Sequence, residues 1–157
     1  DTQPEPGSPL HSYLLRRQIG GLSKPAVPLR IFEWMLREDE DIARQTARRE
    51  FPKVRRRIAK GNPAVLLLLR AGGVSDPTQN HQVVATGYEL DEGTGQLTLF
   101  LYDPNHPEPA EEVQISMTMP ARDRQAVLAQ STGERLRGFF VLDYRPRKRG
   151  LPTLGPE

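Results

Sequence analysis

The chain has 157 residues, of which 36% are hydrophobic and 27% charged, and its formal net charge is only +2. This length suits one domain with a single core, and the composition excludes a fibrous protein. The small net charge favours no particular partner, and the absence of cysteine excludes disulfides and thiolate metal sites. The longest apolar run, residues 64–69, is too short to span a bilayer. Since no export signal is visible, a cytoplasmic location is the default expectation.

The two ends of the chain differ in composition from its middle. Residues 1–9 hold three prolines and a glycine, which is typical of a linker, and residues 146–157 are expected to be a flexible tail. Because Asp1 is not a methionine and lies inside this linker, we expect that upstream residues have been lost. Residues 10–145 would then form one domain.

Residues 10–61 are expected to be helical. Ser8 and Pro9 provide an N-cap and a first-turn proline ahead of an apolar stripe with helical spacing. Residues 29–36 are rich in large apolar side chains and predict a short helix that is largely buried.

A third helix is expected to begin near Asp39 or Asp41, because acidic side chains favour a helix N-terminus. Pro52 is expected to kink or restart this helix, and Gly61 to end it. One face of the helix would be formed by Ile42, Ala43 and Thr46, and by Val54 and Ile58 beyond the proline.

Residues 63–145 are expected to form a sheet. The strands are predicted at residues 64–70, 81–90, 96–102, 111–119 and 138–144. The first is continuously apolar, as in a central strand buried on both faces, whereas the fourth alternates between polar and apolar residues. Helices followed by an antiparallel sheet of about five strands predict an α+β fold.

His81 and Asp103 are the most informative residues of the chain. His81 begins one strand of the predicted hairpin and Asp103 follows the other, and antiparallel pairing brings these two ends together. A histidine beside a carboxylate is the arrangement of a general base and its orienting group in nucleophilic catalysis. We therefore take His81 and Asp103 as candidate catalytic residues, with Asn80, Gln82 and Asn105 as candidate neighbours.

Two segments resemble the papain-like cysteine peptidase superfamily. They are residues 80–89, Asn-His-Gln-Val-Val-Ala-Thr-Gly-Tyr-Glu, and residues 102–107, Tyr-Asp-Pro-Asn-His-Pro. The likeness is to bacteriocin-processing peptidases and to related bacterial papain-like domains of unassigned role, in which a histidine begins a strand and an aspartate precedes a proline after the hairpin. The Gly-Phe-Phe sequence at 138–140 is similar too, and the resemblance covers about residues 9–144.

This resemblance implies that His81 is the general base and that Asp103 orients its imidazole. A nucleophilic cysteine would lie at the N-terminus of an upstream helix, and a glutamine or a backbone amide would form the oxyanion hole. The chain contains no such cysteine. The resemblance therefore implies the His/Asp-bearing portion of a thiol hydrolase of peptides, amides or esters, inactive by itself. Its complement would be a missing N-terminal Cys-bearing segment or a partner chain, and no cofactor is implied.

The lack of a nucleophilic cysteine also agrees with a non-catalytic function. In it the papain-like fold is kept, the chemistry is lost, and the old cleft binds a peptide or another protein. Serine does not replace the thiol by sequence pattern, because no serine lies in a Gly-flanked strand-to-helix turn. The serines considered are Ser12, Ser23, Ser75, Ser116 and Ser131.

Two further kinds of site are weaker on sequence grounds. His106 lies near His81 and Asp103, but the spacing matches no common zinc pattern, so we expect no metal. Basic residues cluster within 48–60 and 145–149 without interleaved aromatic residues, which argues against nucleic acid as a partner. A third reading is a structural domain that binds anionic surfaces through these basic residues, with a steep salt dependence.

Overall fold

The computed structural model describes residues 26–106, 113–120 and 126–143, and within them the chain is α+β, as predicted. The predicted linker, the first helix at Ser8 and the tail lie outside these ranges. The helices are α2 (Ala26–Met35), α3 (Asp39–Gln45), the π-helical η1 (Thr46–Glu50), α4 (Phe51–Ile58) and the 3-10 turn η2 (Pro77–Gln79). The strands are β1 (Ala64–Leu69), β2 (His81–Asp91), β3 (Gln96–Tyr102), β4 (Gln114–Thr118), β5 (Leu128–Gln130) and β6 (Gly138–Val141).

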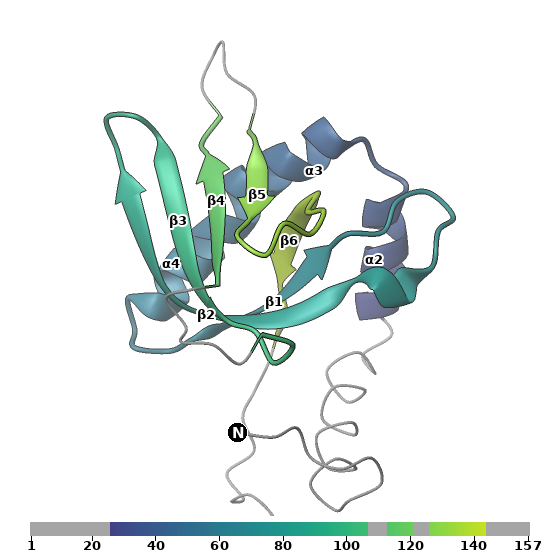
Figure 1. Cartoon of the computed structure of the whole chain (residues 1–157), viewed down its shortest axis with the longest axis horizontal. Helices are drawn as coiled ribbons and strands as arrows, with labels where there is room; N and C mark the ends of the chain where they lie inside the picture. The colour runs from purple at the N-terminus through teal and green to yellow at the C-terminus, as the bar shows by residue number, and fades with distance from the viewer. Residues whose placement is uncertain (1–25, 107–112, 121–125, 144–157) are drawn as a thin grey trace, which may run out of the picture.

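The described strands form one six-stranded antiparallel sheet in the order β5-β4-β3-β2-β1-β6 (Figure 1). β6, the last of the described strands, therefore returns to pair with β1, the first of them. Five strands overlap the predicted ranges. β5 was missed, because its Leu-Ala-Gln sequence is too short to reveal an alternating pattern.

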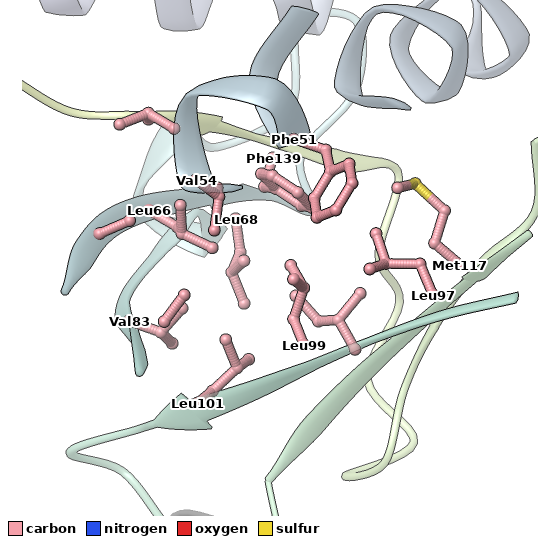
Figure 2. Close-up of a cluster of buried hydrophobic side chains, with 14 of the residues drawn as sticks. Phe51, Val54, Leu66, Leu68, Val83, Leu97, Leu99, Leu101, Met117 and Phe139 are labelled. Carbon is pink, nitrogen blue, oxygen red and sulfur yellow. The ribbon is translucent and has the colours of Figure 1, made fainter. Parts of the chain in front are cut away.

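The curled sheet encloses the larger of two hydrophobic clusters. β1 and β3 project alternate leucines into this cluster, and α4 covers it with Phe51 and Val54, which point toward Phe139 and the leucines (Figure 2). The labelled strand residues of this cluster are Leu66, Leu68, Val83, Leu97, Leu99, Leu101, Met117 and Phe139. Removing such side chains from water is the main favourable contribution to folding.

The smaller cluster lies on the opposite face of β1. Leu67 and Leu69 point away from the larger cluster and pack with Phe140 and with Trp34 of α2. The rings of Trp34 and Phe140 meet edge to face, with their centroids 5.2 Å apart. β1 is therefore buried on both faces, as its continuous apolar run predicted.

The expectation of a largely buried helix at 29–36 is wrong in part. Trp34 and Met35 are buried, but Leu29 is 72% exposed and Phe32 and Leu36 are each 56% exposed. A helix that packs on one side of a sheet buries a single stripe; Leu29 and Phe32 lie outside that stripe, and Leu36 lies in the turn after α2. Apolar content alone does not specify which face is covered.

The helical segment from α3 to α4 agrees closely with the prediction. α3 begins at Asp39, and Ile42, Ala43 and Thr46 are buried. In the π-helical η1, the Phe51 N–H donates to the Thr46 carbonyl five residues earlier. This wider turn directly precedes Pro52, whose ring would clash with the carbonyl four residues back in a regular helix.

The same helical segment approaches the outer edge of β6 closely. A Cβ atom on Gly138 would lie only 2.5 Å from side-chain atoms of both Ile42 and Thr46, so glycine permits this contact. The Thr46 hydroxyl accepts a hydrogen bond from Phe139 N and donates one to Phe139 O, each at 3.1 Å. The buried carboxylate of Glu50 accepts from Val141 N at 2.9 Å.

Candidate functional site

His81 and Asp103 lie at one end of the inner face of the curled sheet. His81 is the first residue of β2 and pairs with Leu68 of β1, whose side chain belongs to the larger cluster. Asp103 directly follows β3, two residues after the inward-facing Leu101. The structure places His81 Nε2 2.6 Å from Asp103 Oδ1, so the two residues meet as the hairpin predicted.

The turn of the hairpin holds its two strands in register. The Asp91 carboxylate accepts hydrogen bonds from the Thr94 hydroxyl and the Gly93 N–H, each at 2.8 Å. Hydrogen bonds from the side chain and backbone of Thr94, and from the backbone of Gly93, lower the pKa of Asp91 below its usual 3.8. These hydrogen bonds favour the ionised form of the Asp91 carboxylate, which links three residues of the turn.

A β-bulge at Thr86 determines which face of the sheet His81 occupies. The register shifts between Ala85 and Gly87, and the unpaired Thr86 is exposed. On the far side of the bulge, the side chain of Tyr88 packs against the larger cluster. If side chains alternated without a bulge from Tyr88 back to the start of β2, Gln82 would face the cluster and His81 would face away from it. The bulge therefore brings His81 to the same face as Asp103.

The environment of Asp103 fixes the tautomer of His81. Asp103 is 1% exposed, and its Oδ1 also accepts a hydrogen bond from the Asn105 N–H at 2.9 Å. In the neutral ring, a carboxylate that accepts from His81 selects the tautomer with the proton on Nε2, which leaves the lone pair on Nδ1. Nδ1 makes no hydrogen bond to any described residue, and the His81 side chain is 16% exposed.

The Asp-Pro-Asn-His segment is both a turn and part of the site. His106 N donates to the Asp103 carbonyl at 3.0 Å, which closes the turn, while Asn105 contributes its backbone N–H. The second carboxylate oxygen of Asp103, Oδ2, is buried and has no hydrogen-bond partner among the described residues. Buried acceptors are usually paired with a protein group or an ordered water.

The other candidate neighbours have different positions. Asn80 Oδ1 accepts from the backbone N–H groups of Arg70 and Ala71, at 3.0 and 3.1 Å, and thereby joins the end of β1 to the start of β2. Gln82 pairs with Leu67, so its side chain lies on the face opposite His81. Asn80 thus links the ends of two strands, and Gln82 is separated from the pair by the sheet.

Sequence reasoning missed a second polar group at this end of the sheet. Arg70 follows β1, and its guanidinium forms two hydrogen bonds to Glu134, at 2.7 and 2.5 Å, and one to Gln130 at 3.1 Å. His106 Nε2 lies 3.8 Å from the same Glu134 carboxylate. Arg70 could have been suspected from its place after an apolar strand, but nothing in the sequence pairs it with Glu134.

A groove of about 510 Å³ begins at this ion pair. Its lining consists of Arg70, Gly72, Ser75, Gln79, Glu134 and Arg135. Ser75, the only serine of this lining, donates to the Gly72 carbonyl at 2.7 Å and accepts from the Gly72 N–H at 2.9 Å. The groove is therefore adjacent to the polar end of the sheet, and His81 is not part of its wall.

The described residues supply no nucleophile to His81. No serine or threonine hydroxyl among them forms a hydrogen bond with the imidazole, and Ser12 and Ser23 lie outside the described ranges. Within the same ranges, no three His, Asp or Glu side chains are grouped so that they could hold a metal ion. The arrangement can thus accept and return a proton at His81 Nδ1, provided that another group brings it.

No family model, curated protein or solved structure matches the chain. None of the helices that the structure describes has the length and apolarity needed to cross a membrane.

Proposed function

We propose that this chain is the His/Asp-bearing portion of a papain-like thiol hydrolase that cleaves peptide, amide or ester bonds by acyl transfer. The observation that supports the proposal is the 2.6 Å contact between His81 Nε2 and the buried Asp103 carboxylate, together with the free lone pair on His81 Nδ1. The resemblance of residues 80–89 and 102–107 to papain-like peptidases supports the same assignment.

In this proposal His81 acts first as a base and then as an acid. Nδ1 takes the proton of a thiol, and the thiolate attacks the substrate carbonyl. The imidazolium then returns the proton to the leaving amine or alcohol as the carbonyl–heteroatom bond breaks. A water molecule, deprotonated by His81, hydrolyses the thioester that remains. Asp103 holds the ring in one orientation and stabilises the imidazolium, as the third member of a catalytic triad does.

The thiol has to come from outside these 157 residues, because they contain no cysteine. A further segment of the protein or a partner chain would supply it. Oδ2 of Asp103 has no donor among the described residues, and a donor from such a segment would satisfy this buried acceptor. We therefore expect the 157-residue chain alone to be inactive, and its substrate to be a peptide or a small acyl compound.

The second candidate is a papain-like pseudoenzyme that binds a peptide or a protein without cleaving it. The observation in its favour is that no hydroxyl of a described residue contacts His81, so these residues offer the base no group to activate. In this case the contact between His81 and Asp103 would serve to shape a binding surface.

The deciding experiment is an intact-mass measurement and N-terminal sequencing of the native protein, followed by alkylation of any thiol with iodoacetamide. If a cysteine is present, the first candidate predicts that it reacts about tenfold or more faster than a free thiol at pH 6.5, because a neighbouring imidazolium stabilises the thiolate. His81→Gln should remove this advantage, whereas His106→Gln, which alters the half-exposed histidine near Glu134, should keep it.

The outcomes separate the two candidates. A native protein and partner without any cysteine would overturn the thiol hydrolase and leave the binding module. If a cysteine is present but His81→Gln leaves its alkylation rate unchanged, His81 does not activate that thiol. This result would overturn the proposed role of His81 whether or not the enzyme is active.

A further inference from the structure

A second groove, of about 600 Å³, lies away from the His81 site between α2, α4 and the end of β6. Its cationic lining consists of Arg30 from α2 and of Lys53, Arg56, Arg57 and Lys60 from α4 and the turn that follows. Asp143 is the only acidic residue among the described residues of the lining, and Val27, Phe140, Val141 and Leu142 form its apolar part. Two separate helices thus direct positive charge into one concave space.

The spacing in α4 places three of its cations on one side. Arg56 and Arg57 follow Lys53 by three and four residues, and residues at these spacings are neighbours on a helix surface, while Lys60 lies in the turn that follows α4. Like charges at this spacing repel each other and destabilise an isolated helix. The helix dipole compensates basic residues in the last turn of α4, but it does not explain the addition of Arg30 from another element.

The carboxylates near the groove neutralise only part of this charge. The buried Glu50 accepts from both Arg30 and Lys53 at 2.6 Å, and Asp143 lies 3.3 Å from Arg57. Arg56 and Lys60 have no ion-pair partner among the described residues. Five cations therefore face two carboxylates, and the formal excess is three positive charges.

We propose that this groove binds a multivalent anion of the phosphate class, such as pyrophosphate or a small phosphoester. Arginine and lysine are the side chains that recognise phosphate oxygens, and the arginine guanidinium can do so with two parallel hydrogen bonds. The volume is that of a small-ligand site. Arg56 and Lys60 would provide the principal contacts, because they form no ion pair with a described residue.

Single-stranded nucleic acid fits the groove less well. The aromatic residue of the lining, Phe140, is fully buried, and the Arg30 guanidinium lies over its ring at 4.3 Å. Bases therefore find no open aromatic surface for stacking in this groove. The phosphate group itself could belong to a free metabolite or to a lipid head group, and the experiment below distinguishes these sources.

The test is a titration of the full chain with pyrophosphate at low salt, followed by calorimetry and by backbone NMR shifts. We expect saturable binding with shifts at α4 and at the end of β6. The double variant Arg56→Gln/Lys60→Gln should weaken binding at least about tenfold, since it removes two charge-assisted contacts. The matched control is Arg48→Gln/Arg49→Gln, which removes the same charge from exposed residues of η1 outside the groove and should change the affinity less than about twofold.

A second arm replaces pyrophosphate by vesicles of phosphatidylcholine with phosphatidylglycerol. Vesicle binding that is lost in the groove variant and displaced by pyrophosphate would support the proposal and identify a lipid head group as the source of the phosphate. No saturable pyrophosphate binding, or equal weakening by both double variants, would overturn it. Binding of a short DNA duplex under conditions where pyrophosphate does not bind would overturn it in favour of a nucleic-acid surface.

Discussion

Asp103 connects the candidate site to the stability of the fold. Its buried carboxylate accepts hydrogen bonds from His81 Nε2 and from the Asn105 N–H. Asp103→Ala should lower the free energy of unfolding by about 2–3 kcal/mol, because both donors lose their acceptor. Asp103→Asn should cost less, since its amide oxygen can replace Oδ1. Urea denaturation measures both changes.

The same substitution tests the tautomer of His81. In the wild-type chain, imidazole ¹⁵N shifts should report a proton on Nε2, and in Asp103→Ala the two tautomers should both be populated. A wild-type ring protonated on Nδ1 instead would contradict the orientation on which the proposed proton transfer depends.

Asp39 provides a residue with a defined pH dependence. Burial raises its pKa, but hydrogen bonds and charge from Arg137 and Arg135 outweigh that effect and lower the pKa below the usual 3.8. A carboxylate with a lowered pKa in the folded state stabilises the protein above pH 3.8, and this contribution is lost as the pH falls through the folded-state value.

We therefore expect the wild-type chain to lose stability below about pH 4 more steeply than Asp39→Asn. Urea denaturation at several pH values between 3 and 7 measures the difference. Arg137 is buried and also donates to the carbonyls of Met35, Ala71 and Arg37, so the loss at low pH should loosen the junction of α2, α3 and β1. Parallel stability curves for the two proteins would contradict this assignment.

At the residue scale the sequence predicted the contact between His81 and Asp103 but not the residues and backbone features around it. The start of β2 and the end of β3 are neighbours in any hairpin, so the approach of His81 to Asp103 follows from local order along the chain. The bulge at Thr86 has no comparable signal, although it determines the face on which His81 lies. The ion pair of Arg70 and Glu134 joins residues 64 positions apart, and only the folded sheet brings them together.

At the element scale, α2 has one face against the sheet and one face in solvent. Trp34→Ala should cost about 3–5 kcal/mol, because it removes a buried ring that packs on Phe140. Leu29→Lys, in the same helix, should cost about 0.5 kcal/mol or less, since Leu29 is largely exposed. The two substituted residues belong to one helix and differ in exposure. Thermal or urea denaturation measures the loss of stability in each variant. Similar losses for both would mean that the exposed face has a partner in solution.

Helices and strands were predictable where periodicity or length made them evident. The apolar run at 64–69 and the acidic start at Asp39 predicted β1 and α3 correctly. The π-helical turn was not predicted, because Pro52 signals an interruption without specifying its form. The burial of α2 was overestimated, since the contacts that select its inner face come from Leu67, Leu69 and Phe140, distant in the sequence.

At the scale of the whole molecule, the two hydrophobic clusters share their strands. β1 contributes Leu66 and Leu68 to one cluster and Leu67 and Leu69 to the other, and β6 is divided in the same way. Loss of either cluster would remove the support of the other, so we expect a single cooperative unfolding transition.

Trp34 makes this prediction measurable. It is the only tryptophan of the chain and belongs to the smaller cluster, whereas far-ultraviolet circular dichroism reports mainly on the helices and the sheet. The urea curves from tryptophan fluorescence and from circular dichroism should coincide. An earlier fluorescence transition would show that α2 separates from the sheet before the larger cluster unfolds.

The hydrogen bonds between β6 and the side chains of Thr46 and Glu50 also affect how copies of this protein meet. A sheet grows by adding a strand to a free edge, where unpaired N–H and C=O groups serve as a template. At β6 the outward groups of Phe139 and the outward N–H of Val141 are already bonded to side chains, so an incoming strand would have to displace them. At the other edge β5 offers only three residues. The described sheet therefore has no long template at either edge, and the fold itself opposes growth into fibrils.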